Sequence, residues 1–326
     1  MLRYIAFWTV RFVVSFLPRW FLYWAGNRMG DINYLLDLRG REAVKSNLRK
    51  ILPPGTPESR VAFEAKWVFR NFAKTLGEFF GYDTFGPDFI DRYVQMKGRE
   101  HIDSALARGR GLIIATAHLG NWELGAATLA HYGYEVWAIA QMHAHPKVNA
   151  LFISIRERRN YRILPMEKAA RPAAKILKGG GLLCILGERN LTEGGIPVTF
   201  FGRTALFPQG PARLAVATGA PIVPGFSVRR ANEGFTMCME PELKVPETGS
   251  RKEKIRVLTQ EFASIVEEYI RWHPSQWGVF FRAWEEDPPG KVTRKPQATG
   301  RGPDEDEPSG APEEAPKASG SGKGAE

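Results

Sequence analysis

The middle of the chain alternates between short apolar runs and amphipathic segments, and this pattern restricts the fold more than any other feature. The strand-like runs are 111–117, 134–141, 161–165, 182–187, 221–229 and 235–243. Helix-like segments lie at 57–80, 122–133, 148–160, 170–181, 208–220 and 252–272, several of them followed by glycine. Such alternation predicts an α/β fold in which helices flank both faces of a central, mostly parallel sheet.

The two ends of the chain differ from this middle part. Residues 288–326 contain seven prolines, seven glycines and no aromatic residue, so they cannot bury enough apolar surface to offset chain entropy, and we expect a disordered tail. The whole chain has a net charge of +10 and this tail has a net charge of −1, so the rest of the chain has a net charge of +11. We therefore divide the chain into an N-terminal helix at 1–24, a domain at 25–287 and a tail at 288–326.

The N-terminal segment 1–24 holds nine aromatic residues and three arginines, and no acidic residue precedes Asp31. This composition is typical of a helix that lies in the membrane interface, with arginines at lipid phosphates. Its apolar stretch is shorter than the roughly 20 residues that a span needs. We expect a peripheral helix on an anionic membrane surface; a single tilted span and an ordinary core helix are the alternatives.

A strand-end histidine is the main candidate for chemistry. His118 follows the apolar run 111–117, and Glu123 begins the next helix five residues later. Active sites of open α/β sheets gather at the carboxyl ends of strands. If Glu123 accepts the Nδ1–H of His118, the Nε2 atom is left free to act as a general base. The alternative is a helix-capping Glu beside an unrelated His.

Several classes of site and partner are disfavoured. The two cysteines, Cys184 and Cys238, form no CxxC motif, and the pair His143 and His145 has no accompanying acidic cluster, so we expect no metal site. No helix-turn-helix, RNP-type or zinc-finger pattern accompanies the basic charge, so we expect no nucleic-acid partner. We considered six arginines as contacts for anionic lipid or an acidic carrier protein: Arg156, Arg158, Arg159, Arg162, Arg229 and Arg230.

Three ordered segments of the sequence resemble one known family. AHLGNWE (117–123) resembles the His-x4-Asp/Glu motif of the lysophospholipid acyltransferase superfamily. ILGERNLTEGGIPVTFFGR (185–203) and FPQGPARLAVATGAPIVPGF (207–226) resemble two further blocks of its branch of late (secondary) lipid A acyltransferases and phosphatidylinositol mannoside acyltransferases. The resemblance covers roughly 100–285.

The resemblance implies acyl transfer from a thioester of acyl carrier protein or coenzyme A to a hydroxyl of a membrane glycolipid. His118 would be the base and Glu123 would orient it. An alcohol can attack a thioester directly once a base takes its proton, so neither a nucleophilic side chain nor a further cofactor is needed. The implied location is the cytoplasmic face of the inner membrane.

The same resemblance suggests residues that bind substrate, although each can instead be a polar loop or surface residue. Arg189 and Arg203 suit phosphate groups, and Gln209 opens a helix that includes Arg213. The full set of predicted substrate-binding residues is Asn121, Glu188, Arg189, Asn190, Arg203 and Arg213.

Two departures from the family pattern affect the predicted acceptor. Gln141 stands about where lipid A acyltransferases have an arginine, and Arg189 replaces a common carboxamide. The second change looks closer to the mannoside enzymes. We expect a lipid A-precursor-like acceptor, with a phosphatidylinositol mannoside or other lysophospholipid as the alternative. A non-catalytic lipid-binding protein of the same fold and a thioester hydrolase are the further alternatives.

Overall fold

The computed structural model describes residues 2–81, 85–190 and 194–284. Its main sheet has the strand order β1-β9-β8-β2-β5-β3-β4, and neighbouring strands are parallel except β8 and β9. The strands are β1 (Val94–Lys97), β2 (Leu112–Thr116), β3 (Val136–Ala140), β4 (Tyr161–Pro165), β5 (Leu182–Leu186), β8 (Ile222–Arg229) and β9 (Phe235–Met239). The predicted fold class is therefore confirmed, while the predicted tail lies outside the described residues.

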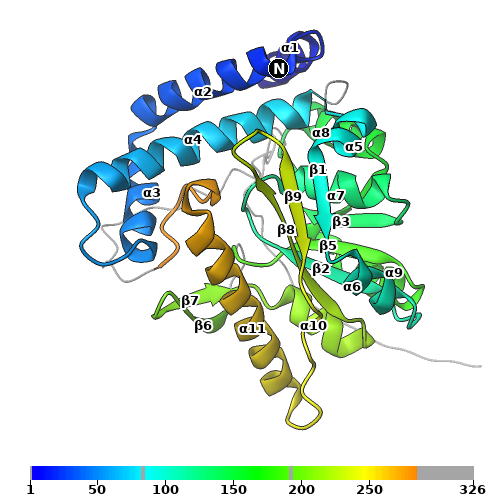
Figure 1. The fold of residues 1–326 in the computed structure, drawn as a ribbon. Helices are drawn as coiled ribbons and strands as arrows, with labels where there is room; N and C mark the ends of the chain where they lie inside the picture. The colour runs from blue at the N-terminus through cyan, green and yellow to red at the C-terminus, as the bar shows by residue number, and fades with distance from the viewer. Residues whose placement is uncertain (1, 82–84, 191–193, 285–326) are drawn as a thin grey trace, which may run out of the picture. The chain divides into compact units, whose positions relative to one another are not determined.

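Helices cover both faces of this sheet (Figure 1). They are α1 (Leu2–Val14), α2 (Arg19–Leu36), α3 (Leu38–Ile51), α4 (Glu58–Phe80), α5 (Pro87–Tyr93), α6 (Arg99–Leu106), α7 (Trp122–His131), α8 (Pro146–Arg158), α9 (Ala170–Lys178), α10 (Gly210–Thr218) and α11 (Arg251–Trp272). Short 3-10 turns add Met166–Lys168 and Pro274–Gln276.

Alternate side chains of the central strand β2 divide the apolar core into two layers. Ile113 and Ala115 pack with buried residues of α3, α4, α9, α10 and α11. Leu112 and Ile114 pack with buried residues of α5, α6 and α7. Successive strand side chains point to opposite faces, so a strand that is apolar at every position is buried on both sides.

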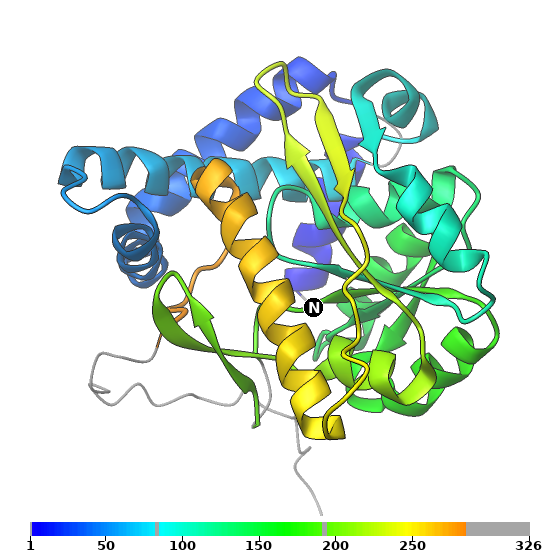
Figure 2. The same cartoon turned by 60° about the horizontal axis from the view of Figure 1, so that its bottom comes forward.

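A hairpin of β6 (Ile196–Phe200) and β7 (Arg203–Phe207) was not predicted. Its two turn residues, Phe201 and Gly202, have φ angles of 52° and 69°, as a tight hairpin turn requires. Phe200 and Phe207 turn into the core, where Phe200 stacks on Trp284 with 5.6 Å between the ring centroids. Figure 2 shows the hairpin beside α11, with α10 near the other end of that helix.

The N-terminal region differs from the single helix predicted at 1–24. It forms α1 and α2 with a break before Pro18, which stands at the N-cap of α2 because its ring removes a backbone donor and fixes φ. The helix α2 then runs on to Leu36 and lies against α4. At Gly30, an added Cβ would come within 2.5 Å of the Arg70 backbone, so the glycine permits this close contact.

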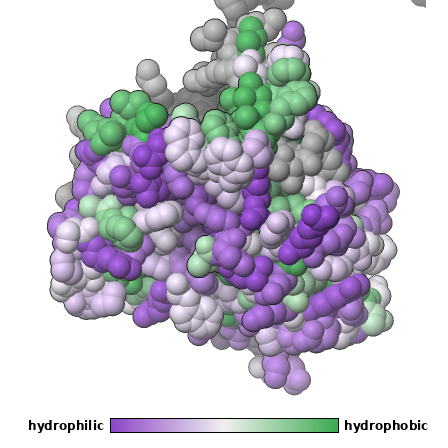
Figure 3. All heavy atoms as spheres, turned by 45° about the horizontal axis from the view of Figure 1, so that its top comes forward, coloured by the Kyte–Doolittle hydropathy of each residue, from purple (hydrophilic) through white to green (hydrophobic). Residues whose placement is uncertain are grey.

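Large apolar side chains on α1 and α2 remain exposed. They are Ile5, Trp8, Val10, Phe12, Val13, Trp20, Trp24, Met29, Ile32, Leu35 and Leu36, with Phe16 in the break between the helices. Figure 3, a view toward the side that carries these helices, shows hydrophobic side chains in two groups along its upper edge and hydrophilic ones over much of its middle. Among the described helices, none combines the length and apolar character needed to cross a membrane.

Candidate active site

A cavity of about 840 Å³ opens at the carboxyl ends of the parallel strands. Its walls come from α4, α7, α8, α9 and α10, from the first residue of α11 and from residues of β2, β3, β4 and β5. Most of the lining is apolar, and the ionisable side chains that reach it are His118, Glu123, His143, Tyr161, Cys184, Arg156, Arg189, Arg213 and Arg251. A cavity of this size and lining suits a mostly apolar ligand that carries a few polar groups.

The loop that carries His118 is fixed by backbone hydrogen bonds from distant parts of the chain. The Gly278 N–H donates to the His118 carbonyl at 2.8 Å, and the Gly120 N–H donates to the Gln276 carbonyl at 3.0 Å. Gly120 has φ of 63°, and a Cβ there would come within 2.0 Å of the Ser227 carbonyl oxygen. Only glycine fits this position, which holds the loop against β8.

His118 pairs with Glu188. Its ring Nδ1 lies 2.7 Å from Oε1 of Glu188, and its backbone N–H donates to the same oxygen at 2.8 Å. An ionised carboxylate can only accept, so the proton of the neutral imidazole is on Nδ1 and the Nε2 lone pair is free. The imidazole lies against the Trp122 ring with 4.8 Å between centroids.

The environment of Glu188 keeps this carboxyl ionised. Burial alone would raise its pKa, but the electrostatic interaction with His118 and the hydrogen bonds from the His118 ring and backbone outweigh burial and hold the pKa of Glu188 below its usual range. The Glu188 side chain is 1% exposed and that of His118 is 18% exposed. The carboxylate is thus shielded from water while the imidazole still reaches the cavity.

The predicted contact between Glu123 and the Nδ1–H of His118 is wrong. Glu123 instead forms a two-point ion pair with Arg156, at 2.7 and 3.1 Å, and accepts a hydrogen bond from the Tyr161 hydroxyl at 2.5 Å. Burial would raise the pKa of Glu123, but the Arg156 charge and these hydrogen bonds lower it below the usual range. Arg156 on α8 and Tyr161 on β4 thus hold the Glu123 carboxylate in place, and Glu123 still lines the cavity.

Asn121, predicted to bind substrate, is fully buried and structural. Its side-chain oxygen caps α7 by accepting the Leu124 N–H at 2.9 Å, and its Nδ2 donates to Glu78 at 2.7 Å. Asn121 is 0% exposed and does not line the cavity, so it is not available to a ligand there.

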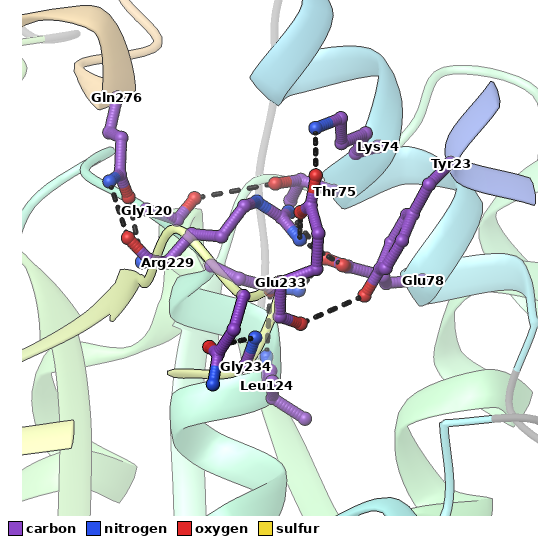
Figure 4. Close-up of polar contacts among 12 residues, drawn as sticks. Tyr23, Lys74, Thr75, Glu78, Gly120, Leu124, Arg229, Glu233, Gly234 and Gln276 are labelled. Atoms are coloured by element: carbon purple, nitrogen blue, oxygen red, sulfur yellow. Dashed lines mark hydrogen bonds and ion pairs between the residues drawn. The ribbon is translucent and has the colours of Figure 1, made fainter. Parts of the chain in front are cut away.

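Glu78 in turn belongs to a buried ionic network under the active-site loop (Figure 4). Arg229 holds both carboxylate oxygens of Glu78, at 2.5 and 2.9 Å. Lys74 binds Glu233 at 2.6 Å, and the Gln276 side chain exchanges two hydrogen bonds with the Arg229 backbone, both at 2.8 Å. The network connects α4, β8 and the turn after β8 to the segment that fixes the His118 loop.

The other predicted binding residues divide into two groups. Arg189 and Arg213 line the cavity, whereas Asn190 and Arg203 do not. Arg203 is exposed at the start of β7. Gln141 and His143 also line the cavity.

Among the six arginines considered for anionic partners, three have largely buried side chains that bind acceptors inside the protein. Arg156 and Arg229 form the buried ion pairs described above, and buried Arg159 donates to the Glu78 and Phe79 carbonyls. Exposed Arg162 pairs with Glu135. The first three are therefore unavailable for docking a partner.

Sequence comparison now decides the family. The model of the bacterial lipid A biosynthesis acyltransferases matches residues 1–286. The chain belongs to this family. The enzyme is accordingly an acyltransferase, and its resemblance to the lipid A and phosphatidylinositol mannoside branch is confirmed.

Curated relatives of the chain are of two kinds, phosphatidylinositol mannoside acyltransferases and a lipid A biosynthesis acyltransferase. The phosphatidylinositol mannoside acyltransferase of Mycobacterium tuberculosis is 27% identical over 76% of this chain and 78% of its own length. The enzyme of the same name from Mycolicibacterium smegmatis is 26% identical over 76% and 81%. A lipid A biosynthesis acyltransferase from Haemophilus influenzae is 21% identical over 71% and 73%.

Proposed function

We propose that this acyltransferase moves a fatty acyl group from a thioester to a hydroxyl of a membrane glycolipid, with His118 as general base. The observation that supports this most directly is the His118–Glu188 pair at a largely apolar cavity. The same pair argues against a non-catalytic lipid-binding protein, because a binding pocket alone does not need an oriented imidazole with a free Nε2 atom.

The proposed reaction follows from this geometry. The Nε2 atom of His118 takes the acceptor hydroxyl proton as the hydroxyl oxygen attacks the thioester carbonyl carbon. The tetrahedral intermediate then collapses, the carbon–sulfur bond breaks, and the leaving thiolate takes the proton back from His118. The products are an ester and a free thiol. Glu188 stabilises the imidazolium that exists between these two proton transfers and keeps its ring in position.

For the acceptor, we propose a mannosylated phosphatidylinositol as the first candidate and a lipid A precursor as the second. The relatives with the former name are 26–27% identical to this chain, against 21% for the relative with the latter name. Arg189, exposed at the cavity, offers a guanidinium to an acceptor phosphate.

We also propose that the protein works at the cytoplasmic face of the cell membrane, docked through the apolar side chains of α1 and α2. Eleven large apolar residues on these two helices are exposed, together with Phe16 between them. Exposed aromatic residues beside arginines are typical of peripheral helices at a lipid surface.

The test is transfer of radiolabelled palmitate from the coenzyme A or acyl carrier protein thioester to each acceptor in mixed vesicles. We expect one acceptor to be labelled by the wild-type protein and its labelling to fall about 10²–10⁴-fold in His118→Ala. The matched control is His131→Ala, which removes a histidine paired with Asp91 on the surface. Equal labelling by His118→Ala and wild type would refute the general-base role. Release of free palmitate with no acceptor labelled would instead identify a hydrolase.

A further inference from the structure

Two arginines at the cavity are not used by the proposed reaction. Arg213 lies on α10 and Arg251 is the first residue of α11; both line the cavity and both are exposed. A side chain that lines a cavity and also reaches solvent lies at its opening. We propose that Arg213 and Arg251 form a phosphate-binding site at the mouth of the cavity, an inference that rests on the proposed function.

The two guanidinium groups differ from the largely buried arginines near the site. Arg156 is neutralised by Glu123, and Arg229 is neutralised by Glu78. Within residues 2–81, 85–190 and 194–284, neither Arg213 nor Arg251 has a carboxylate within ion-pair distance. Their positive charge is therefore available to an anion from solution. Guanidinium groups bind phosphate oxygens through paired, charge-assisted hydrogen bonds.

The rest of the cavity indicates what accompanies that phosphate. Behind the opening, the walls include small or aliphatic side chains that are buried or half-buried, among them Ala126, Ala138, Ile163 and Ile185. A ligand that fills this space combines an apolar chain inside with an anion at the opening. Both an acyl thioester of a phosphopantetheine carrier and a phospholipid acceptor have this chemistry, so the phosphate has two possible sources.

Arg256 provides a matched control for the site. It lies on the same helix as Arg251, is exposed in the same way and does not line the cavity. Substitution of Arg256 by Gln changes the net charge as much as either site substitution does. Any effect of overall charge on anion binding would therefore be the same in Arg256→Gln as in Arg251→Gln.

The experiment measures binding to the full-length protein by calorimetry, with two probes. One probe is coenzyme A. The other is vesicles of phosphatidylcholine that contain about 20 mol% phosphatidylinositol. We expect the double variant Arg213→Gln, Arg251→Gln to bind one of these probes about tenfold to hundredfold more weakly, as loss of one to two charge-assisted contacts implies. The double Lys variant should bind with intermediate affinity, and Arg256→Gln should bind like wild type.

The outcomes separate the two sources and the two proposals. Weaker coenzyme A binding assigns the site to the donor, and weaker vesicle binding assigns it to the acceptor. Unchanged binding of both probes, or an equal loss in Arg256→Gln, would overturn the phosphate site. His118→Ala should bind both probes normally while losing acyl transfer. Binding and acyl transfer are thus separate measurements, and the phosphate site can be tested even if the catalytic proposal fails.

Discussion

The ring Nδ1 of His118 lies 2.7 Å from Oε1 of Glu188, and each residue stands two positions beyond a paired strand end. In the parallel register of β2 and β5, Thr116 is opposite Leu186, so two more residues along each strand bring His118 opposite Glu188. The acid that orients the proposed base therefore comes from the neighbouring strand and not from the helix that follows the histidine.

Substitution of Glu188 should reduce turnover without removing the histidine. In Glu188→Gln, the imidazole loses the carboxylate that fixes its tautomer and stabilises its positive charge, so we expect kcat to fall about 10²–10⁴-fold with little change in KM. Steady-state acyl transfer assays at saturating donor test this. Glu135→Gln, which alters only an exposed ion pair with Arg162, should have wild-type kcat. A Glu188→Gln enzyme with normal kcat would contradict the assignment.

Substitution of Glu123 should act mainly on stability. Glu123→Gln leaves the Arg156 guanidinium, whose side chain is 11% exposed, without its counter-charge, and we expect a loss of about 3–5 kcal/mol in the free energy of unfolding. Chemical denaturation followed by circular dichroism measures it. If Glu123→Gln kept wild-type stability and lost turnover as fully as Glu188→Gln, Glu123 would have to act on the reaction directly.

The ionisation of Glu123 should also make stability depend on pH. Its pKa is lower in the folded protein than the ordinary value of 4.5, so the stabilising contribution is complete above pH 4.5 and is lost as pH falls through the folded-state pKa. We expect the difference in unfolding free energy between wild type and Glu123→Gln to shrink below pH 4.5. Urea denaturation between neutral and acidic pH measures this difference, and a difference that widened toward acid would show the opposite sign of linkage.

The Glu78–Arg229 pair should separate stability from positioning of the His118 loop. The side chains of Glu78 and Arg229 are 1% and 6% exposed. Glu78→Leu alone leaves the buried Arg229 with only a longer contact to Glu233, at 3.5 Å, and should cost about 3 kcal/mol. The double variant Glu78→Leu, Arg229→Met should recover most of that stability. It still removes the acceptor of the Asn121 side chain, which caps α7, so its turnover should stay below wild type. Recovery of both stability and turnover would show that this network has no role in positioning.

The exposed aromatic residues near the N-terminus should determine membrane binding. Trp8, Phe12, Phe16 and Trp20 are 50–74% exposed, and replacing all four by Ser removes apolar area without opening the core. We expect partition into anionic vesicles to fall by at least about tenfold. Sedimentation with vesicles measures it. Trp272→Gln, which changes an equally exposed aromatic residue on α11, should partition like wild type.

Local patterns predicted six of the seven strands of the main sheet, because a strand that is apolar at every position is encoded within a few residues. They missed the four-residue edge strand β1 and the helices α3, α5 and α6. The hairpin β6–β7 escaped because its strands have only five residues each and Pro197, a residue that disfavours a strand interior, interrupts the first. The break before Pro18 was visible in the sequence, but the 1–24 prediction treated the aromatic stretch as one element.

The site shows where local reasoning stops. The spacing of His118 and Glu123 allows a contact along one loop, but the contact that forms depends on which strands become neighbours. A signal was present in the sequence, since Glu188 follows its predicted strand at the same offset as His118 follows its own. Recognising the pair required the order of β2 and β5 in the sheet, and the fate of Glu123 required the positions of Arg156 and Tyr161.

The hydrogen bonds from Gln276 and Gly278 to the His118 loop have a consequence for biosynthesis. The ribosome synthesises this segment after His118 and Glu188. A nascent chain that has emerged only through α11 therefore contains both residues but lacks Gln276 and Gly278, whose backbone groups hold the His118 loop. The reaction centre is therefore completed only when translation of the body is nearly finished. An incomplete chain on the ribosome would hold the catalytic groups without their working arrangement.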